Sequence, residues 1–128
     1  KNSPKLLILM FQKEFAMRLT DNKINSINSL VNCFYNINYQ FDVSKYCFRP
    51  IPKVESRVLT FEKKKYNLLE VFEVEKFIEF KRYLFSHKRK SLKNLLRDFN
   101  LKSNLDLENR VENLELKELI RIFRNINF

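Results

Sequence analysis

Apolar residues in the first half of the chain follow the spacing of strands and short helices. Residues 6–11 form a continuous apolar run, which is typical of a strand buried on both faces. Residues 13–19 predict a short helix, and apolar residues at three- and four-residue steps predict an amphipathic helix over residues 24–36. Residues 37–43 alternate between apolar and polar side chains, as in a half-buried strand, and residues 54–61 predict another strand. This order indicates part of an α/β sheet domain.

The second half of the chain has helical spacing throughout. Stripes of apolar residues occur at 77–85, 92–99 and 116–123 and predict three short helices. Ser91 precedes the second stripe and is a suitable N-cap, because its hydroxyl can accept a hydrogen bond from a free N–H at the start of a helix. Three such helices can bury their apolar faces against one another. The charged run 62–65 separates them from the strands.

These patterns divide the chain into two parts. Residues 1–61 have the pattern of the end of a larger sheet domain, and residues 62–128 have the pattern of an all-helical lobe. A sheet fragment of this kind leaves strand edges without partners. We therefore expect the isolated chain to be marginally stable.

The chain is strongly basic. It has 25 Lys and Arg residues against 15 Asp and Glu residues, which gives a formal net charge of +10. Basic proteins bind polyanions by releasing counterions from phosphates, so a nucleic-acid partner is favoured. Codon bias accounts for part of the lysine excess, because the chain is also rich in Asn, Ile and Phe and has no Gly or Trp.

Several kinds of site are excluded by composition. No apolar run approaches the length of a membrane-spanning helix, and no secretory signal is evident. Cys33 and Cys47 therefore indicate a reducing compartment, so we expect a cytoplasmic or, alternatively, an organellar protein. Two cysteines and the single His87 do not make a metal-ligand set. The absence of glycine excludes glycine-rich phosphate and nucleotide loops, so the chain carries no self-sufficient catalytic motif.

Four segments occur in an order that resembles a known family. MFQKE at residues 10–14 with RL at 18–19 resembles M-x-Q-K-E-x-x-x-R-L, and FRPIPKVES at residues 48–56 resembles F-x-P-x-P-K-V-D-S, with Glu in place of Asp. Residues 85–95 resemble F-x-x-R-R-K-x-x-x-N-x-L, and residues 110–114 resemble R-x-E-x-L. The ordered set is similar to the KsgA-type ribosomal RNA adenine dimethyltransferases and covers nearly the whole chain.

The resemblance implies a fold and a reaction. Members of this family transfer methyl groups from S-adenosylmethionine to the exocyclic amine of adenines in small-subunit ribosomal RNA. The expected fold class is α/β, with the C-terminal strands of a Rossmann-like methyltransferase sheet followed by a small all-helical lobe. The family's donor-binding glycine motif and its Asn-Leu-Pro-Tyr motif precede the matched region, so this chain alone is expected to bind no donor. The implied partners are small-subunit ribosomal RNA or a pre-ribosomal subunit, and a missing N-terminal methyltransferase half.

The resemblance also assigns the residue at the target base. Phe48 matches the family aromatic that lies beside the flipped adenine, and an aromatic face can replace the stacking that such a base loses. Pro50 and Pro52 would hold the loop rigid. The alternative is that Phe48 is a core residue and the prolines only start a strand. Residues 12–14 either act on the substrate or fix the turn between strand and helix.

Basic side chains are the expected contacts to RNA. Lys53 would contact phosphate or would end its strand in solvent. On a helix, Arg89, Lys93 and Arg97 share a face, as do Lys90 and Arg97, and such a stripe suits RNA phosphates. The predicted RNA-binding set is Lys53, Lys88, Arg89, Lys90, Lys93 and Arg97. The alternative is an ordinary solvated helix face.

Three functions are open from the sequence. The first is the target-base and RNA-binding side of an adenine dimethyltransferase, active only with its missing half. The second is a non-enzymatic ribosomal-RNA-binding or ribosome-assembly remnant that lacks the donor site. The third is a relative recruited to another nucleic-acid role, as in the mitochondrial transcription-factor branch. The first two share the RNA partner and differ in catalysis.

Overall fold

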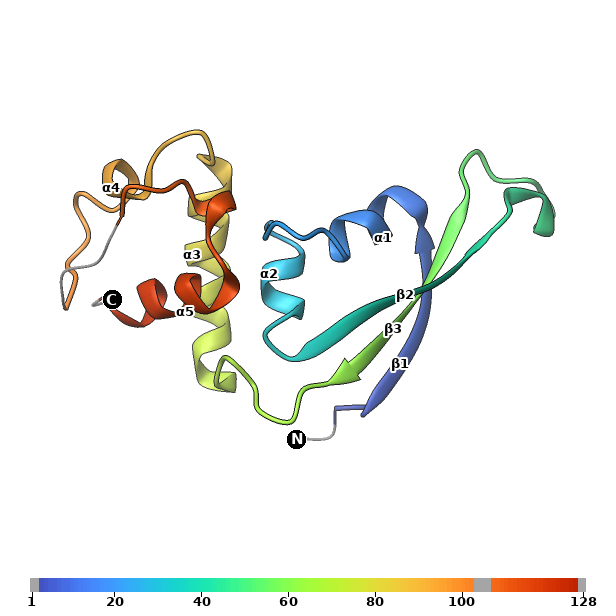
Figure 1. Ribbon diagram of the computed structural model, residues 1–128, viewed down its shortest axis with the longest axis horizontal. Helices are drawn as coiled ribbons and strands as arrows, with labels where there is room; N and C mark the ends of the chain where they lie inside the picture. The colour runs from blue at the N-terminus through green and yellow to red at the C-terminus, as the bar shows by residue number, and fades with distance from the viewer. Residues whose placement is uncertain (1–2, 103–106, 127–128) are drawn as a thin grey trace.

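A three-stranded antiparallel sheet and a helical lobe make up the protein, whose computed structural model describes residues 3–102 and 107–126 (Figure 1). The strands are β1 (Leu6–Gln12), β2 (Tyr35–Val43) and β3 (Ser56–Lys63), in the order β1-β3-β2. The central strand β3 pairs with β1 along its whole length and with β2 across a register shift between Tyr39 and Phe41. The three predicted strands are therefore confirmed. The expectation that residues 6–11 are buried on both faces is wrong for these described residues, because Leu6, Ile8 and Met10 are exposed on one face of the sheet.

One face of the sheet is covered by helix α1 (Lys13–Leu19), which follows β1 directly. Ala16 and Leu19 of α1 pack on Leu59 and Phe61 of β3, and all four side chains are buried. Burying a leucine-sized side chain contributes about 1.5–3 kcal/mol. The contact therefore fixes α1 against the middle of the sheet.

The helix expected over residues 24–36 is much shorter, because α2 spans only Asn28–Val31. Asn25 Oδ1 accepts hydrogen bonds from the backbone N–H groups of Ile27 and Asn28, and Asn28 Nδ2 donates to the carbonyls of Arg18 and Lys23. Asparagine side chains that bond to the backbone in this way compete with the regular helical pattern. They hold residues 18–28 as a compact turn before the single helical turn of α2.

The helical lobe contains α3 (Val74–Ser86), α4 (Leu92–Leu95) and α5 (Leu116–Arg124), with the 3₁₀ segments η2 (Val71–Glu73) and η3 (Val111–Asn113). The three predicted stripes coincide with these helices, although α4 is only one turn long. Its side-chain cap is as expected, since Ser91 Oγ accepts a hydrogen bond from Asn94 N at 3.4 Å. The core is built from side chains of every helix, including Phe77, Leu84, Leu92 and Leu119.

The two parts share core residues. Strand β3 continues to Lys63, so the polar connector begins later than the run 62–65 indicated. Ile24 and Cys33 from the first part are buried in the helical core, and burial raises the pKa of the Cys33 thiol to about 12. These two side chains tie the segment around α2 to the lobe. The division into two domains at residue 61 stays a prediction.

Candidate functional site

The two motif segments around residues 10–19 and 48–56 meet at one end of the sheet. Gln12, the last residue of β1, lies opposite Ser56, the first residue of β3. The backbone N–H of Lys13 donates to the carbonyl of Glu55 at 3.0 Å. The start of α1 is therefore attached to the end of the loop that carries Phe48.

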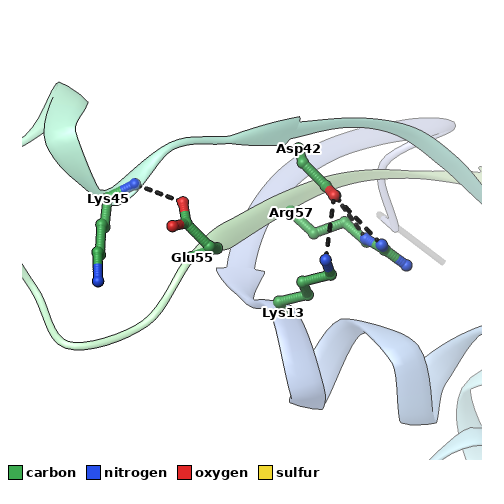
Figure 2. A network of polar contacts seen from close by, with 5 residues as sticks. All are labelled: Lys13, Asp42, Lys45, Glu55 and Arg57. Atoms are coloured by element: carbon green, nitrogen blue, oxygen red, sulfur yellow. Dashed lines mark hydrogen bonds and ion pairs between the residues drawn. The ribbon is translucent and has the colours of Figure 1, made fainter.

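Loop residues 44–55 connect β2 to β3 and project beyond the sheet, at the end away from the helical lobe (Figure 1). The 3₁₀ segment η1 (Lys45–Cys47) lies at its start, where Ser44 Oγ accepts from Tyr46 N at 3.3 Å. Glu55 Oε2 accepts from Lys45 N at 2.6 Å, across the mouth of the loop (Figure 2). Both ends of the loop are thus joined by one carboxylate.

A second carboxylate, that of Asp42, joins strand β2 to β3 and to the start of α1 at the base of the loop. Asp42 Oδ1 accepts from Arg57 Nε at 2.7 Å, and Asp42 Oδ2 lies 3.6 Å from Lys13 Nζ (Figure 2). The hydrogen bond from Arg57 lowers the pKa of the Asp42 carboxyl. The Arg57 guanidinium also lies over the Tyr39 ring, 4.5 Å from its centroid. Strands β2 and β3 and the start of α1 are therefore held together at the base of the loop.

Phe48 follows η1 and is half-buried, in an extended conformation. Its N–H donates to the carbonyl of Lys45 at 3.3 Å. The peptide between Arg49 and Pro50 is cis, and Lys53, further along the loop, is exposed. Phe48 therefore belongs to a loop whose two ends are fixed. Its side chain is neither buried in the core nor fully exposed to solvent.

The basic run Lys88-Arg89-Lys90 does not lie on a helix, so the predicted helical stripe is wrong in its geometry. Helix α3 ends at Ser86, and residues 87–90 form the turn before Ser91 caps α4. All three side chains are exposed, as are Lys93 and Arg97. Lys93 Nζ lies 3.5 Å from Glu108 Oε1, and Arg97 donates to Asn94 Oδ1 at 3.0 Å.

Three of the six predicted basic residues line two separate cavities. A cavity of about 360 Å³ is lined by Lys88 together with Arg18 and Lys23, and by the carboxylates Asp21 and Glu112. A second cavity of about 320 Å³ is lined by residues that include Lys90 and Arg97. Lys90 and Arg97 do line the same cavity, but both belong to turns, one before and one after α4. Arg18 and Lys23 were missed as companions of Lys88, although Arg18 belongs to the first motif.

Lys81, in the same basic stretch of sequence, lies in the protein interior. Its side chain is 8% exposed, and Nζ donates to Ser26 Oγ at 3.1 Å. Burial lowers the pKa of this lysine. Lys81 therefore joins α3 to the segment before α2 and does not face the surface that the other basic residues form.

Within residues 3–102 and 107–126, no three His, Cys, Asp or Glu side chains gather as a metal site. Within the same residues, every helix is too short or too polar to cross a membrane.

Comparison with known proteins places these features in a family. Residues 2–127 match the family described as "Ribosomal RNA adenine dimethylase". The chain is 35% identical to ribosomal RNA small subunit methyltransferase A of Thermotoga maritima, over 93% of this chain and 43% of that protein. It is 36% identical to the protein of the same name from Mycoplasma capricolum, over 93% of this chain and 50% of that protein. The chain thus spans about half the length of the relatives it matches.

Solved structures share the fold. A dimethyladenosine transferase from Plasmodium falciparum aligns with a TM-score of 0.78 at 22% identity, over 96% of this chain and 57% of that chain. The 23S rRNA methyltransferase ErmE aligns with a TM-score of 0.63 at 17% identity, over 95% of this chain and 55% of that chain. The expected fold class, the C-terminal portion of a methyltransferase sheet with a helical lobe, is confirmed.

Proposed function

This chain belongs to the ribosomal RNA adenine dimethylase family, and we propose that it supplies the target-base and RNA-binding side of an enzyme that dimethylates adenines in small-subunit ribosomal RNA. The observation that carries the proposal is the loop of residues 44–55. It carries Phe48 beyond the end of the sheet, and the hydrogen bond from Lys45 N to the Glu55 carboxylate joins its two ends. In this role the Phe48 ring stacks on the flipped adenine. Such stacking contributes about 1–3 kcal/mol per base.

Helix α1 supports this assignment because it connects the loop to the basic cavity. At its start, Lys13 is bonded to Glu55 at the base of the loop. At its end, Arg18 lines the same cavity as Lys88 from the helical lobe. A single RNA that places a base at Phe48 would reach Arg18 and Lys88 through its backbone, with phosphate contacts that add affinity without reading sequence.

The methyl donor, S-adenosylmethionine, is assigned to a different part of the enzyme. Close approach of backbone to a nucleotide-like ligand generally uses glycine, which this chain lacks. Among the described residues, none has a positive φ. The residues present do not fit a glycine-type cradle, so in this proposal the chain alone binds no donor and is inactive. A non-enzymatic RNA-binding role would use the same basic residues.

The RNA assignment is tested by the salt dependence of binding. The triple variant Lys88→Gln, Arg89→Gln and Lys90→Gln should weaken binding to a small-subunit ribosomal RNA helix. It should also lower the magnitude of the slope of log K against log salt by about 2–3, since each of the three lost phosphate contacts removes about 0.7–0.9. The slope is measured by fluorescence anisotropy between about 50 and 200 mM salt.

A matched control separates a site from net charge. The exposed residues Lys65, Lys117 and Arg121 lie elsewhere, and changing all three to Gln removes the same formal charge. This control variant should change the slope much less. Equal effects of the two triple variants would refute a localised RNA site around residues 88–90.

A further inference from the structure

A second aromatic ring lies close to Phe48 on the protruding loop. Tyr46 belongs to η1 and is 66% exposed, whereas Phe48, two residues later, is half-buried. Residues two apart have their Cα atoms no more than about 7 Å from each other. The two rings therefore leave the backbone at neighbouring points of a loop that projects beyond the sheet (Figure 1).

The backbone that carries Tyr46 is ordered by hydrogen bonds within the loop. Tyr46 N donates to Ser44 Oγ at 3.3 Å, and Cys47 N donates to the Ser44 carbonyl at 3.0 Å. The adjacent Lys45 N donates to the Glu55 carboxylate at 2.6 Å. A tyrosine side chain has few rotatable bonds, so a ring on an ordered backbone loses little entropy on binding. Tyr46 is therefore a preformed contact surface.

Cations alternate with the aromatic rings along this loop. Lys45 Nζ lies 5.4 Å from the centroid of the Tyr46 ring, and Arg49 and Lys53 are exposed. The one acidic residue of the loop, Glu55, is hydrogen-bonded to the backbone of Lys45. Aromatic rings set among positive charges are typical of proteins that bind single-stranded nucleic acid, since the rings stack on bases and the cations contact phosphates. The chemistry of the loop therefore favours a nucleotide as the ligand of Tyr46.

A base that leaves its stack stays joined to its neighbours through the sugar-phosphate backbone, and enzymes that flip a base also contact the flanking nucleotides. We infer that Tyr46 stacks on the nucleotide next to the target adenine, while Phe48 receives the adenine itself. The inference rests on the proposed function, because it takes Phe48 as the site of the target base. Every base has a π-face, so Tyr46 adds affinity and fixes the position of the strand without reading the neighbouring base.

Binding of a short single-stranded RNA to the full chain tests this inference. The probe is an oligouridylate with a single adenine, and its binding is measured by fluorescence anisotropy. Tyr46→Ala should weaken binding by about fivefold or more, which is the lower end of the effect of losing one base–aromatic stack. Tyr46→Phe keeps the ring and should bind within about a factor of two of the unchanged chain.

Tyr66 provides a matched control. Its ring is 76% exposed and its centroid lies 5.6 Å from Lys65 Nζ, but it belongs to the connector after β3. Tyr66→Ala removes the same kind of ring from the same kind of lysine contact and should leave binding unchanged. A difference between the two alanine variants therefore reports the position of Tyr46, and not the loss of an exposed aromatic side chain in general.

The fluorescence of 2-aminopurine separates the two rings, because stacking on an aromatic side chain quenches it. With 2-aminopurine next to the adenine, a saturating amount of the chain should quench the fluorescence. Tyr46→Ala should remove that quenching, and Phe48→Ala should leave it. With 2-aminopurine in place of the adenine, the dependence on the two residues should be reversed.

Three results would overturn the assignment of Tyr46. They are binding by Tyr46→Ala within about a factor of two of the unchanged chain, an equal loss of binding in Tyr66→Ala, and quenching beside the adenine that persists in Tyr46→Ala. Self-association of the chain that Tyr46→Ala abolishes would assign the ring to a protein contact instead. If Phe48→Ala changes neither quenching signal, the proposed function is refuted while Tyr46 remains a nucleotide contact. Absence of RNA binding by the unchanged chain would refute both.

Discussion

Replacing Glu55 with alanine should release the loop that carries Phe48 without unfolding the sheet. The Glu55 carboxylate accepts from Lys45 N at 2.6 Å, and the Glu55 carbonyl accepts from Lys13 N at 3.0 Å. Glu55→Ala removes only the first contact, because the second belongs to the backbone. The strand register and α1 should therefore remain, while η1 loses its link across the loop.

The size of the effect follows from the contact that is lost. Hydrogen bonds to charged groups contribute about 1.5–3 kcal/mol when buried, and loss of a helix cap costs about 0.5–2 kcal/mol. Glu55 is half-buried, so water can replace part of the contact. We expect about 1 kcal/mol of local stability to be lost, which corresponds to roughly fivefold faster exchange of the Lys45 amide.

Amide hydrogen exchange measured by NMR resolves this residue from the rest of the chain. Glu55→Gln keeps an acceptor oxygen and should retain most of the protection at Lys45. Glu14→Ala removes an exposed carboxylate from α1 and is the control. The reasoning is refuted if Glu55→Ala leaves Lys45 exchange within about a factor of two of the unchanged protein, or if it accelerates exchange equally in the helical lobe, since that would indicate global destabilisation.

Two other predictions concern buried groups. Lys81→Met should raise the free energy of unfolding at pH 7 by about 1 kcal/mol in denaturant melts, because it removes a buried ammonium whose recorded partner is the Ser26 hydroxyl. Burial lowers the pKa of Lys81, so the unfolded chain binds more protons than the folded chain as pH approaches 10.5. The free energy of unfolding of the unchanged protein should therefore rise over that range relative to the variant. A difference in unfolding free energy that stays constant with pH would contradict this. A thiol reagent should modify exposed Cys47 rapidly and Cys33 only after unfolding, and two fast thiols in the folded protein would contradict the burial of Cys33.

The elements that the sequence predicted correctly are those stabilised by contacts between residues close together in the chain. Helix α1 covers Lys13–Leu19, as expected, and β1 coincides with the apolar run at residues 6–11. The Ser91 cap was predicted because its hydrogen bond joins residues three apart. Each of these features depends on neighbours in the sequence, so the pattern alone contains the information.

Features that depend on side-chain hydrogen bonds or distant contacts could not be predicted. The helix over residues 24–36 fails because Asn25 and Asn28 bond to backbone groups, which apolar spacing does not register. The helical basic stripe fails because α3 ends at Ser86. The grouping of Arg18 with Lys88 comes from packing between the two parts of the chain, so no sequence spacing indicates it.

Contacts where β1 ends and β3 begins give a structural role to Lys13 in the first motif and Glu55 in the second. Residues 12–14 could have acted on substrate or fixed the turn into α1, and the contacts of Lys13 favour the second interpretation. Its N–H bonds to Glu55, and its ammonium lies near Asp42, which also binds Arg57. In the proposed function this loop receives a flipped base, and a loop that is already ordered loses less entropy when it binds. Lys13 and Glu55 therefore fix the ends of the loop that carries Phe48, which is the position that the proposed function requires.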